Sequence, residues 1–219
     1  MEDRSVRNRT GCGPAGRRLA SQNPGPEHEA LGRGNIAEER NPAVVSYSIE
    51  IPPQLEEWAA LAGYSLTPET DDGRAMFWSA GGEVRHFIGT NDSGWFTVTD
   101  SDRLGPEYLV FLAPSMATIE IYFFGKFGGY IRGRKSLPRV HIPFEPEEIS
   151  PGFTIQSRKF DGVDRLTLIA SDGSEVAASS GDKFSGTAEL VELSCYLSVT
   201  VDDIIASYQS PDGRPLFTS

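Results

Sequence analysis

The sequence predicts an α+β protein in which two antiparallel β-meanders, and the helices packed against them, form a single domain. Three observations carry this prediction. Two groups of short strand-like runs are separated by turn-forming residues, which is the pattern of antiparallel hairpins. Segments with apolar residues at helical spacing precede, separate and follow these groups. Hydrophobic residues make up 38% of the 219 residues, enough to bury one sizeable core.

The first 42 residues differ in composition from the rest, because they lack aromatic side chains and any persistent periodicity. This predicts a disordered extension over residues 1–42 and an ordered domain over residues 43–219. The extension holds seven arginines and six acidic residues, whereas the domain holds 13 basic and 25 acidic residues. An acidic domain disfavours a nucleic-acid or anionic-membrane surface and favours a basic protein partner. The alternative is that the charge only maintains solubility.

The first predicted elements are a helix and three strands. Prolines at 52–53 and apolar residues at i, i+3, i+4 and i+7 predict a helix that ends at Gly63. The runs "RAMFWS", "EVRHFI" and "GWFTVTD" then predict an antiparallel meander. Its turns are the glycine-containing tripeptide 80–82 and the polar cluster 90–93.

Residues 105–129 predict a long helix. Pro106 and Glu107 suit its first turn, Pro114 interrupts it, Ser115 restarts it, and the pair Gly128 and Gly129 ends it. A proline-rich extended connection follows over residues 137–152.

The second half repeats the plan of the first. The runs 153–160, 163–170 and 174–179 predict three strands, joined by the hairpin signals Asp-Gly at 161–162 and 172–173. Helices follow over residues 187–197 and 201–208, and Thr200 with Asp203 resembles a capping box. The aromatic runs of the two halves, which include Phe87 and Phe123, predict one shared core.

A cluster of cations follows the aromatic run 122–130, and it allows three interpretations. Lys126, Arg132, Arg134 and Lys135, with Arg139, would suit a nucleic-acid surface. The stretch "GYIRGRKS" resembles a phosphate-binding loop, but its glycines are one residue too close together. The helical spacing of the phenylalanines favours the third interpretation, a buried helix whose glycine end is followed by a basic loop.

No residue pattern predicts catalysis, a metal or a cofactor. His28, His86 and His141 lie far apart in the sequence, and His86 is expected to be a buried sheet residue. Cys12 and Cys195 form no disulfide framework or zinc spacing, which fits a reducing cytoplasm. No apolar run predicts a membrane span or a secretory signal. We therefore expect a cytoplasmic protein without catalytic, cofactor or metal residues.

Two clusters of acids remain as candidate binding residues. The first contains Asp71 and Asp72, beside Glu69, and the second contains Glu145, Glu147 and Glu148. Turn chemistry and a helix N-terminus explain them structurally. As exposed acids they are also candidates to meet a basic partner, and the second cluster is favoured. An enzyme that uses paired carboxylates stays open as an alternative.

Four stretches resemble the family of immunity factors for the tuberculosis necrotizing toxin, which are mycobacterial antitoxins. They are "DDGRAMFWSAGGEVRHFI", "SDRLGPEYLVFLAPSMATIEIYFFGKFGG", "LPRVHIPFEPEEISPGFTI" and the carboxyl-terminal "LVELSCYLSVTVDDIIASYQSPDGRPLFTS". The most specific pieces are "GGEVRHFI", "YFFGKFGG" and "GRPLFT". The resemblance runs in unchanged order from about residue 55 to residue 218. The extension over 1–42 and the stretch "SSGDKFSGTAEL" depart from the family pattern.

This resemblance implies a function. The toxin of that family is an NAD⁺ glycohydrolase, and the immunity factor binds the toxin domain in the cytosol and blocks access of NAD⁺. The resemblance therefore implies a protein partner, one toxin domain per immunity protein, and no enzymatic activity. In that setting the five acids Glu145, Glu147, Glu148, Asp71 and Asp72 become the candidate toxin-binding residues.

Overall fold

The computed structural model describes residues 49–160, 162–180 and 183–217. The predicted extension over 1–42 lies outside these residues, and so do Cys12 and His28, so the predicted domain boundary stays a prediction. Within the described part, four helices and an eight-stranded antiparallel sheet form an α+β fold. The predicted fold class is therefore confirmed.

The sheet joins the two predicted meanders edge to edge. Its strand order is β1-β2-β3-β4-β5-β8-β7-β6. The first meander comprises β1 (Tyr64–Thr67), β2 (Ala75–Ser79), β3 (Val84–Thr90), β4 (Phe96–Asp102) and β5 (Tyr108–Ala113). The second comprises β6 (Phe153–Phe160), β7 (Val163–Ala170) and β8 (Glu175–Ser179). Only two residue pairs, Phe111 with Ser179 and Leu112 with Ala178, connect β5 to β8.

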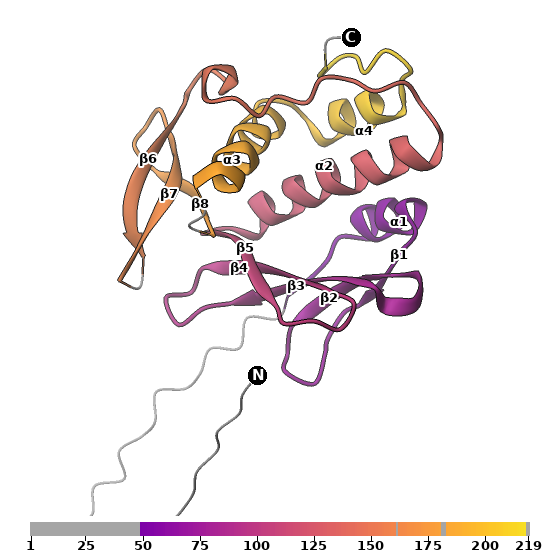
Figure 1. Cartoon of the computed structure of the whole chain (residues 1–219), viewed down its shortest axis with the longest axis horizontal. Coiled ribbons are helices and arrows are strands. Elements are labelled where there is room, and N and C mark those ends of the chain that lie inside the picture. The colour runs from indigo at the N-terminus through magenta and orange to yellow at the C-terminus, as the bar shows by residue number, and fades with distance from the viewer. Residues whose placement is uncertain (1–48, 161, 181–182, 218–219) are drawn as a thin grey trace, which may run out of the picture. The chain divides into compact units, whose positions relative to one another are not determined.

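The helices are α1 (Pro53–Ala62), α2 (Met116–Arg134), α3 (Lys183–Leu197) and α4 (Val201–Gln209), and short 3₁₀ turns η1 (Ala80–Gly82) and η2 (Pro146–Glu148) complete the elements. Figure 1 shows α2 crossing the centre of the domain, with β1–β5 on one side of it and α3 and α4 on the other. Contacts between α2 and all three other helices agree with this view. The central helix therefore contributes to most of the packing.

Several predicted helix ends and turns are confirmed by the structure. Gly63 ends α1 in the left-handed conformation with φ of 89°, and both glycines of the η1 turn have positive φ. Ser115 caps α2, since its side chain accepts a hydrogen bond from the backbone amide of Thr118. The capping box of Thr200 and Asp203 begins α4. Helix α3 begins at Lys183, four residues before its predicted start.

Residues 108–113 form strand β5, so the predicted helix from Pro106 to Pro114 is wrong. Strand β5 lies between β4 and β8, and its last four residues are buried. The sequence of a strand that is paired on both edges and buried on both faces is an unbroken run of apolar residues. Such a run has no period that separates it from a buried helix. Strand β1 was not predicted from the sequence at all.

The predicted end of α2 at Gly128 and Gly129 is also wrong, because the helix continues to Arg134. A β-carbon at Gly128 would lie 2.2 Å from the ring of Tyr208, and one at Gly125 would lie 2.1 Å from the ring of Tyr196. These two glycines therefore let α3 and α4 approach α2 closely. A glycine inside a helix is about 1 kcal/mol less favourable than an alanine, and the packing against the tyrosines offsets this cost.

The aromatic core is centred on α2 and the first meander. The ring centroids of Phe77 and Phe123 lie 5.2 Å apart, and those of Phe123 and Phe127 lie 5.3 Å apart. Trp58 of α1 donates a hydrogen bond to the carbonyl oxygen of Phe124 at 2.9 Å. Phe123 therefore belongs to the predicted core. Phe87 is buried but outside this cluster, with the guanidinium of Arg74 4.3 Å from its ring centroid.

Candidate functional site

The first acidic cluster lies in the connection between β1 and β2. Asp72 accepts hydrogen bonds from Arg74 at 2.9 Å and from the Thr70 hydroxyl at 2.6 Å. These bonds, that of Arg74 above all, lower the pKa of Asp72 to about 2. Asp71 is exposed, and no hydrogen bond or ion pair in the described chain engages its side chain. Asp72 thus stabilises the turn, whereas the Asp71 carboxylate faces solvent.

The second acidic cluster surrounds the η2 turn. Glu145 and Glu148 form a capping box, in which Glu148 accepts from the backbone amides of Phe144 and Glu145, each at 3.0 Å. Glu148 also pairs with His141. The backbone amide of Glu145, then His141, lowers the pKa of Glu148 to about 2. Glu147 is exposed, with no such interaction in the described chain.

The structure does not bring the two clusters together. In Figure 1 the β1–β2 connection lies at the lower edge of the domain and the η2 turn near its upper edge. Each cluster has the structural role that its turn chemistry predicts. Their assignment as toxin-binding residues stays a prediction.

The cations of the 126–135 stretch do not form the predicted basic loop. Arg132 is 5% exposed, and its guanidinium donates to the carbonyl oxygens of Pro138, Ser210 and Pro211 at 2.6–2.8 Å. Lys126 is held inside the domain by Asp100. Helix α2 continues past the glycines, so both residues lie on it. A nucleic-acid surface would therefore lack two of the five cations assigned to it.

A buried polar chain connects the sheet to α2, and it was not predicted from the sequence. Asp100 of β4 accepts from His86 Nδ1 at 2.6 Å and from Lys126 Nζ at 2.9 Å. Lys126 also donates to the Tyr122 hydroxyl at 3.0 Å. The predicted buried sheet position of His86 is confirmed, since it is 1% exposed. The one signal in the sequence was Lys126 itself, because a lysine within an apolar helical run requires an acidic partner if it is buried.

The protonation states in this chain follow from its geometry. Burial would raise the pKa of Asp100, but the hydrogen bond with His86 and the charge of Lys126 lower it overall. Burial lowers the pKa of His86. Its Nε2 atom has no partner among the described residues, and a protonated ring would place an unsatisfied N–H there. His86 is therefore neutral, with Nδ1–H donating to Asp100.

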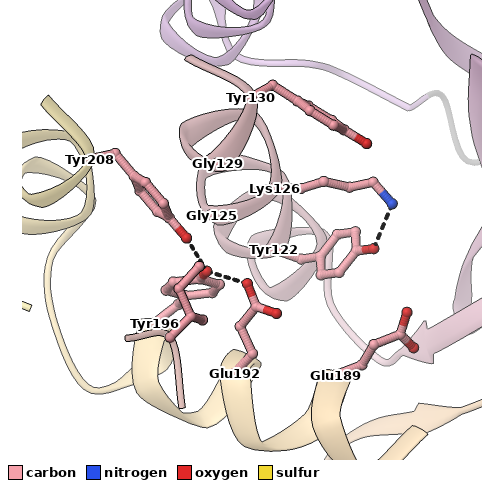
Figure 2. Close-up of a pocket in the computed structure, with 10 residues that line it drawn as sticks. Tyr122, Gly125, Lys126, Gly129, Tyr130, Glu189, Glu192, Tyr196 and Tyr208 are labelled. Carbon is pink, nitrogen blue, oxygen red and sulfur yellow. Dashed lines mark hydrogen bonds between the residues drawn. The ribbon is translucent and has the colours of Figure 1, made fainter. Parts of the chain in front are cut away.

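A cavity of about 310 Å³ lies beside this chain, between α2, α3 and α4. Figure 2 shows tyrosines from all three helices around it, with Lys126 on one wall and two glutamates of α3 on another. The lining residues are Tyr122, Gly125, Lys126, Gly129, Tyr130, Ile142, Glu189, Glu192, Tyr196 and Tyr208. None of the glutamates or tyrosines among them was predicted as a site residue, because only packing of the three helices brings them together.

The cavity has its own hydrogen-bond chain. Tyr196 donates to the carboxylate of Glu192, and the hydroxyls of Tyr196 and Tyr208 are hydrogen-bonded (Figure 2). Burial raises the pKa of Glu192, although the hydrogen bond from Tyr196 opposes this. When it is ionised, a partly buried carboxylate among aromatic rings attracts cations.

The described residues contain no group of three or more His, Cys, Asp and Glu side chains that could hold a metal ion. A search of the described helices finds none long and apolar enough to cross a membrane.

Comparison with known proteins gives consistent matches. A sequence model of the family Immunity protein 61 matches residues 58–216. Two curated relatives, the immunity factor for TNT of Mycobacterium tuberculosis and its homolog in Mycobacterium bovis, are each 41% identical over 176 residues. Each alignment covers 80% of this chain and 96% of the relative. The solved structure of Rv3902c from M. tuberculosis has a TM-score of 0.71 at 41% identity, covering 80% of this chain and 97% of that one.

Proposed function

The chain belongs to the Immunity protein 61 family, and we propose that it is a cytoplasmic antitoxin that binds an NAD⁺ glycohydrolase toxin domain. One immunity protein covers one toxin domain and blocks the access of NAD⁺ to the toxin's active site. The protein needs no cofactor and catalyses no reaction in this role. The family match identifies the chain as an immunity protein. We propose the mode of inhibition, the stoichiometry and the compartment.

The observation that supports this proposal most is the extent of the similarity to the immunity factors for TNT. It covers nearly all of each relative, so it is not confined to a shared structural fragment. Inhibition by coverage also requires a preformed surface of about 800 Å² on each partner. A domain built around one central helix and a continuous sheet can present such a surface without first becoming ordered.

The five predicted acids are our proposed steering contacts with the toxin. The five acids fall into two groups by their local structure. Asp72, Glu145 and Glu148 each stabilise a turn. Asp71 and Glu147 have exposed carboxylates without such a role and are therefore the informative positions. Exposed charges at the rim of an interface act mainly on the association rate and its salt dependence.

The first experiment titrates this protein into a fixed amount of the cognate toxin domain while NAD⁺ hydrolysis is followed. We expect hydrolysis to stop near equal molar amounts, because a tight inhibitor titrates its target stoichiometrically. Undiminished hydrolysis at a large excess of this protein would reject the proposal. Binding without loss of hydrolysis would reject the blocked-access mechanism but retain the partner.

A second experiment tests the acidic contacts through charge reversal. We expect Glu147→Lys and Asp71→Lys to slow association with the toxin several-fold at low salt, with a smaller difference at high salt. Glu57→Lys on α1 is the matched control, since Glu57 is also exposed but belongs to neither cluster. If all three variants associate at the wild-type rate, these acids do not face the toxin.

One observation favours a second candidate function, an enzyme that uses carboxylates. Glu189 and Glu192 line the same cavity, and burial raises the pKa of Glu192, as in a general acid. The test is incubation of this protein alone with NAD⁺. Turnover that Glu192→Gln abolishes would establish the enzyme, whereas we expect no turnover.

A further inference from the structure

The cavity between α2, α3 and α4 combines aromatic walls with a shielded carboxylate. Rings of Tyr122, Tyr130, Tyr196 and Tyr208 line it, together with Glu192 (Figure 2). The faces of aromatic rings attract cations electrostatically, most strongly where water is excluded. Carboxylates supply the charge partner that a lysine or arginine requires.

The hydrogen-bond chain of the cavity ends at the carboxyl group of Glu192. Tyr196 has one phenolic proton and donates it to Glu192, so Tyr208 must be the donor in its bond with Tyr196. Both phenol dipoles therefore point along the chain toward the carboxylate. In the described part of the chain, no salt bridge includes Glu192. A cation that enters from outside would compensate a charge that burial now disfavours.

The lysine in the cavity wall does not supply this compensation directly. Its ammonium group contacts Asp100 at 2.9 Å and the Tyr122 hydroxyl at 3.0 Å. Two of its three donors are thus used, and its nearest carboxylate partner is Asp100. Lys126 forms its ion pair with Asp100 and acts on Glu192 only through its charge at longer range, so the carboxylate that is left without an ion pair within the described chain is that of Glu192.

A glycine at the mouth of the cavity has no packing role within the described chain. Gly129 lies inside α2 and lines the cavity, yet a β-carbon at this position would meet nothing within 4 Å. Gly125 and Gly128 differ, because tyrosine rings fill the equivalent space. A glycine in a helix interior costs about 1 kcal/mol. Gly133 of the same helix also faces open space, so what distinguishes Gly129 is its place in the wall of this cavity, where a partner could approach the backbone.

Exposed aromatic side chains surround the region. Tyr130 is 39% exposed and Tyr108 is 53% exposed. Tyr108 lines a second cavity, of about 390 Å³, which adjoins the first because Lys126 and Glu189 line both. Phe184, which is 82% exposed, precedes Ser185 of the same second cavity. Aromatic anchors beside a pocket are typical of the centre of a protein–protein interface.

We propose that this cavity receives a lysine or arginine side chain of the toxin, with Glu192 as its charge partner and Gly129 and Tyr130 at the mouth. The assignment rests on the proposed function for its partner. A protein side chain, in preference to a free amine, suits the exposed aromatic residues around the mouth and the acidic net charge of −11. The pocket thereby adds a specific anchor to the steering acids of the two turns.

The first test does not depend on the toxin. N-acetyl-arginine amide is titrated into the full-length protein, and the backbone amide of Gly129 is followed by NMR. N-acetyl-citrulline amide is the control, because it has nearly the same shape without the charge. We expect saturable binding of the arginine probe, at least about fivefold tighter than the citrulline probe. Glu192→Gln should remove the difference. Equal responses to both probes would overturn the cation pocket.

The second test uses the toxin domain and blocks the mouth. Gly129→Leu should weaken toxin binding about thirtyfold, as expected for loss of an anchor, and should not lower the melting temperature. Gly133→Leu is the matched control, one turn further along α2, where a β-carbon also meets nothing within 4 Å. We expect its toxin affinity to stay within about twofold of wild type. Wild-type affinity of Gly129→Leu would overturn the proposed contact.

The two tests separate the two proposals. If wild-type protein fails to bind the toxin while the arginine probe binds selectively, the proposed function fails and the cation pocket stands for another partner. If wild type inhibits the toxin and Gly129→Leu inhibits equally well, the proposed function stands and the pocket contact is wrong. Selective probe binding together with normal toxin binding by Gly129→Leu would assign the pocket to a free cation.

Discussion

At the scale of single residues, Asp100 satisfies two other polar side chains inside the domain. It is 6% exposed and accepts from both His86 and Lys126. A buried cation that loses its only acidic partner retains the cost of desolvation without compensation. The stability of the sheet–helix junction therefore depends on this one carboxylate.

We expect Asp100→Asn to lower the free energy of unfolding by about 3 kcal/mol or more, because it leaves Lys126 buried without a counter-charge. Urea denaturation measures this change. Asp102→Asn is the control, since Asp102 lies two residues further on the same strand and is exposed. A loss below about 1 kcal/mol for Asp100→Asn would show that water reaches Lys126.

His86 should make stability depend on pH near neutrality. Burial lowers its pKa in the folded state, so below about pH 6.5 the unfolded chain binds a proton that the folded chain does not. Stability should therefore fall as the pH decreases from 7.5 to 5.5. The lowered pKa of Asp100 acts in the same direction, but only near pH 4 and below.

Urea denaturation of wild type and His86→Gln at several pH values tests this dependence. The variant should be less stable throughout, and its stability should change less over this pH range. Parallel curves for the two proteins would mean that His86 titrates alike in the folded and unfolded states.

At the scale of elements, α2 is the central helix, because α1, α3 and α4 all pack against it. Its glycines are not equivalent, because Gly125 and Gly128 face tyrosine rings whereas Gly129 and Gly133 face open space. Arg132, near its end, binds the backbone of the segment after α4. The sequence "FGKFGGYIRGR" is therefore a packing surface, in which Gly125 and Gly128 are the sites of close approach between helices.

We expect Gly128→Ala to destabilise the protein by about 3 kcal/mol, because its methyl group would overlap the ring of Tyr208. Gly133→Ala should instead be neutral or stabilising by up to about 1 kcal/mol, since alanine is the better helix former. Thermal denaturation of both variants measures the contrast. A higher melting temperature for Gly128→Ala would contradict the close packing of α4 on α2.

At the scale of the whole molecule, the described strands pair with one another and the described helices pack with them around one core. Among the described residues, all eight strands pair within one sheet, and one core cluster includes residues of all four helices. A relative that this chain covers to 96% of its length is matched over 176 residues only. The immunity function should therefore belong to the domain.

A protein of residues 43–219 should melt within about 2 °C of the full chain and inhibit the toxin at the same molar ratio. Calorimetry and the NAD⁺ hydrolysis titration measure the two quantities. If the shortened protein is stable but inhibits poorly, the extension contributes to toxin binding. If it is also unstable, the predicted boundary at residue 43 is wrong.

Sequence patterns alone predicted the fold class and most of the elements, and the resemblance predicted the family. Capping residues, turn glycines and periodicity are local, so Gly63, Ser115 and the pair Thr200 and Asp203 could be read without a structure. Local signals failed where consecutive residues are all buried, since the last four residues of β5 have no polar face to give the strand a period.

The candidate pocket, in contrast, follows from the packing of the helices and could not be predicted from the sequence. Tyr122, Glu192 and Tyr208 lie on three helices, and no spacing along the chain relates them. They meet because Gly125 and Gly128 remove the β-carbons that would hold α3 and α4 away from α2. From the sequence, a glycine is expected only to lower the stability of its helix. The packing shows that the same glycines stabilise the fold, because they allow closer contact between helices.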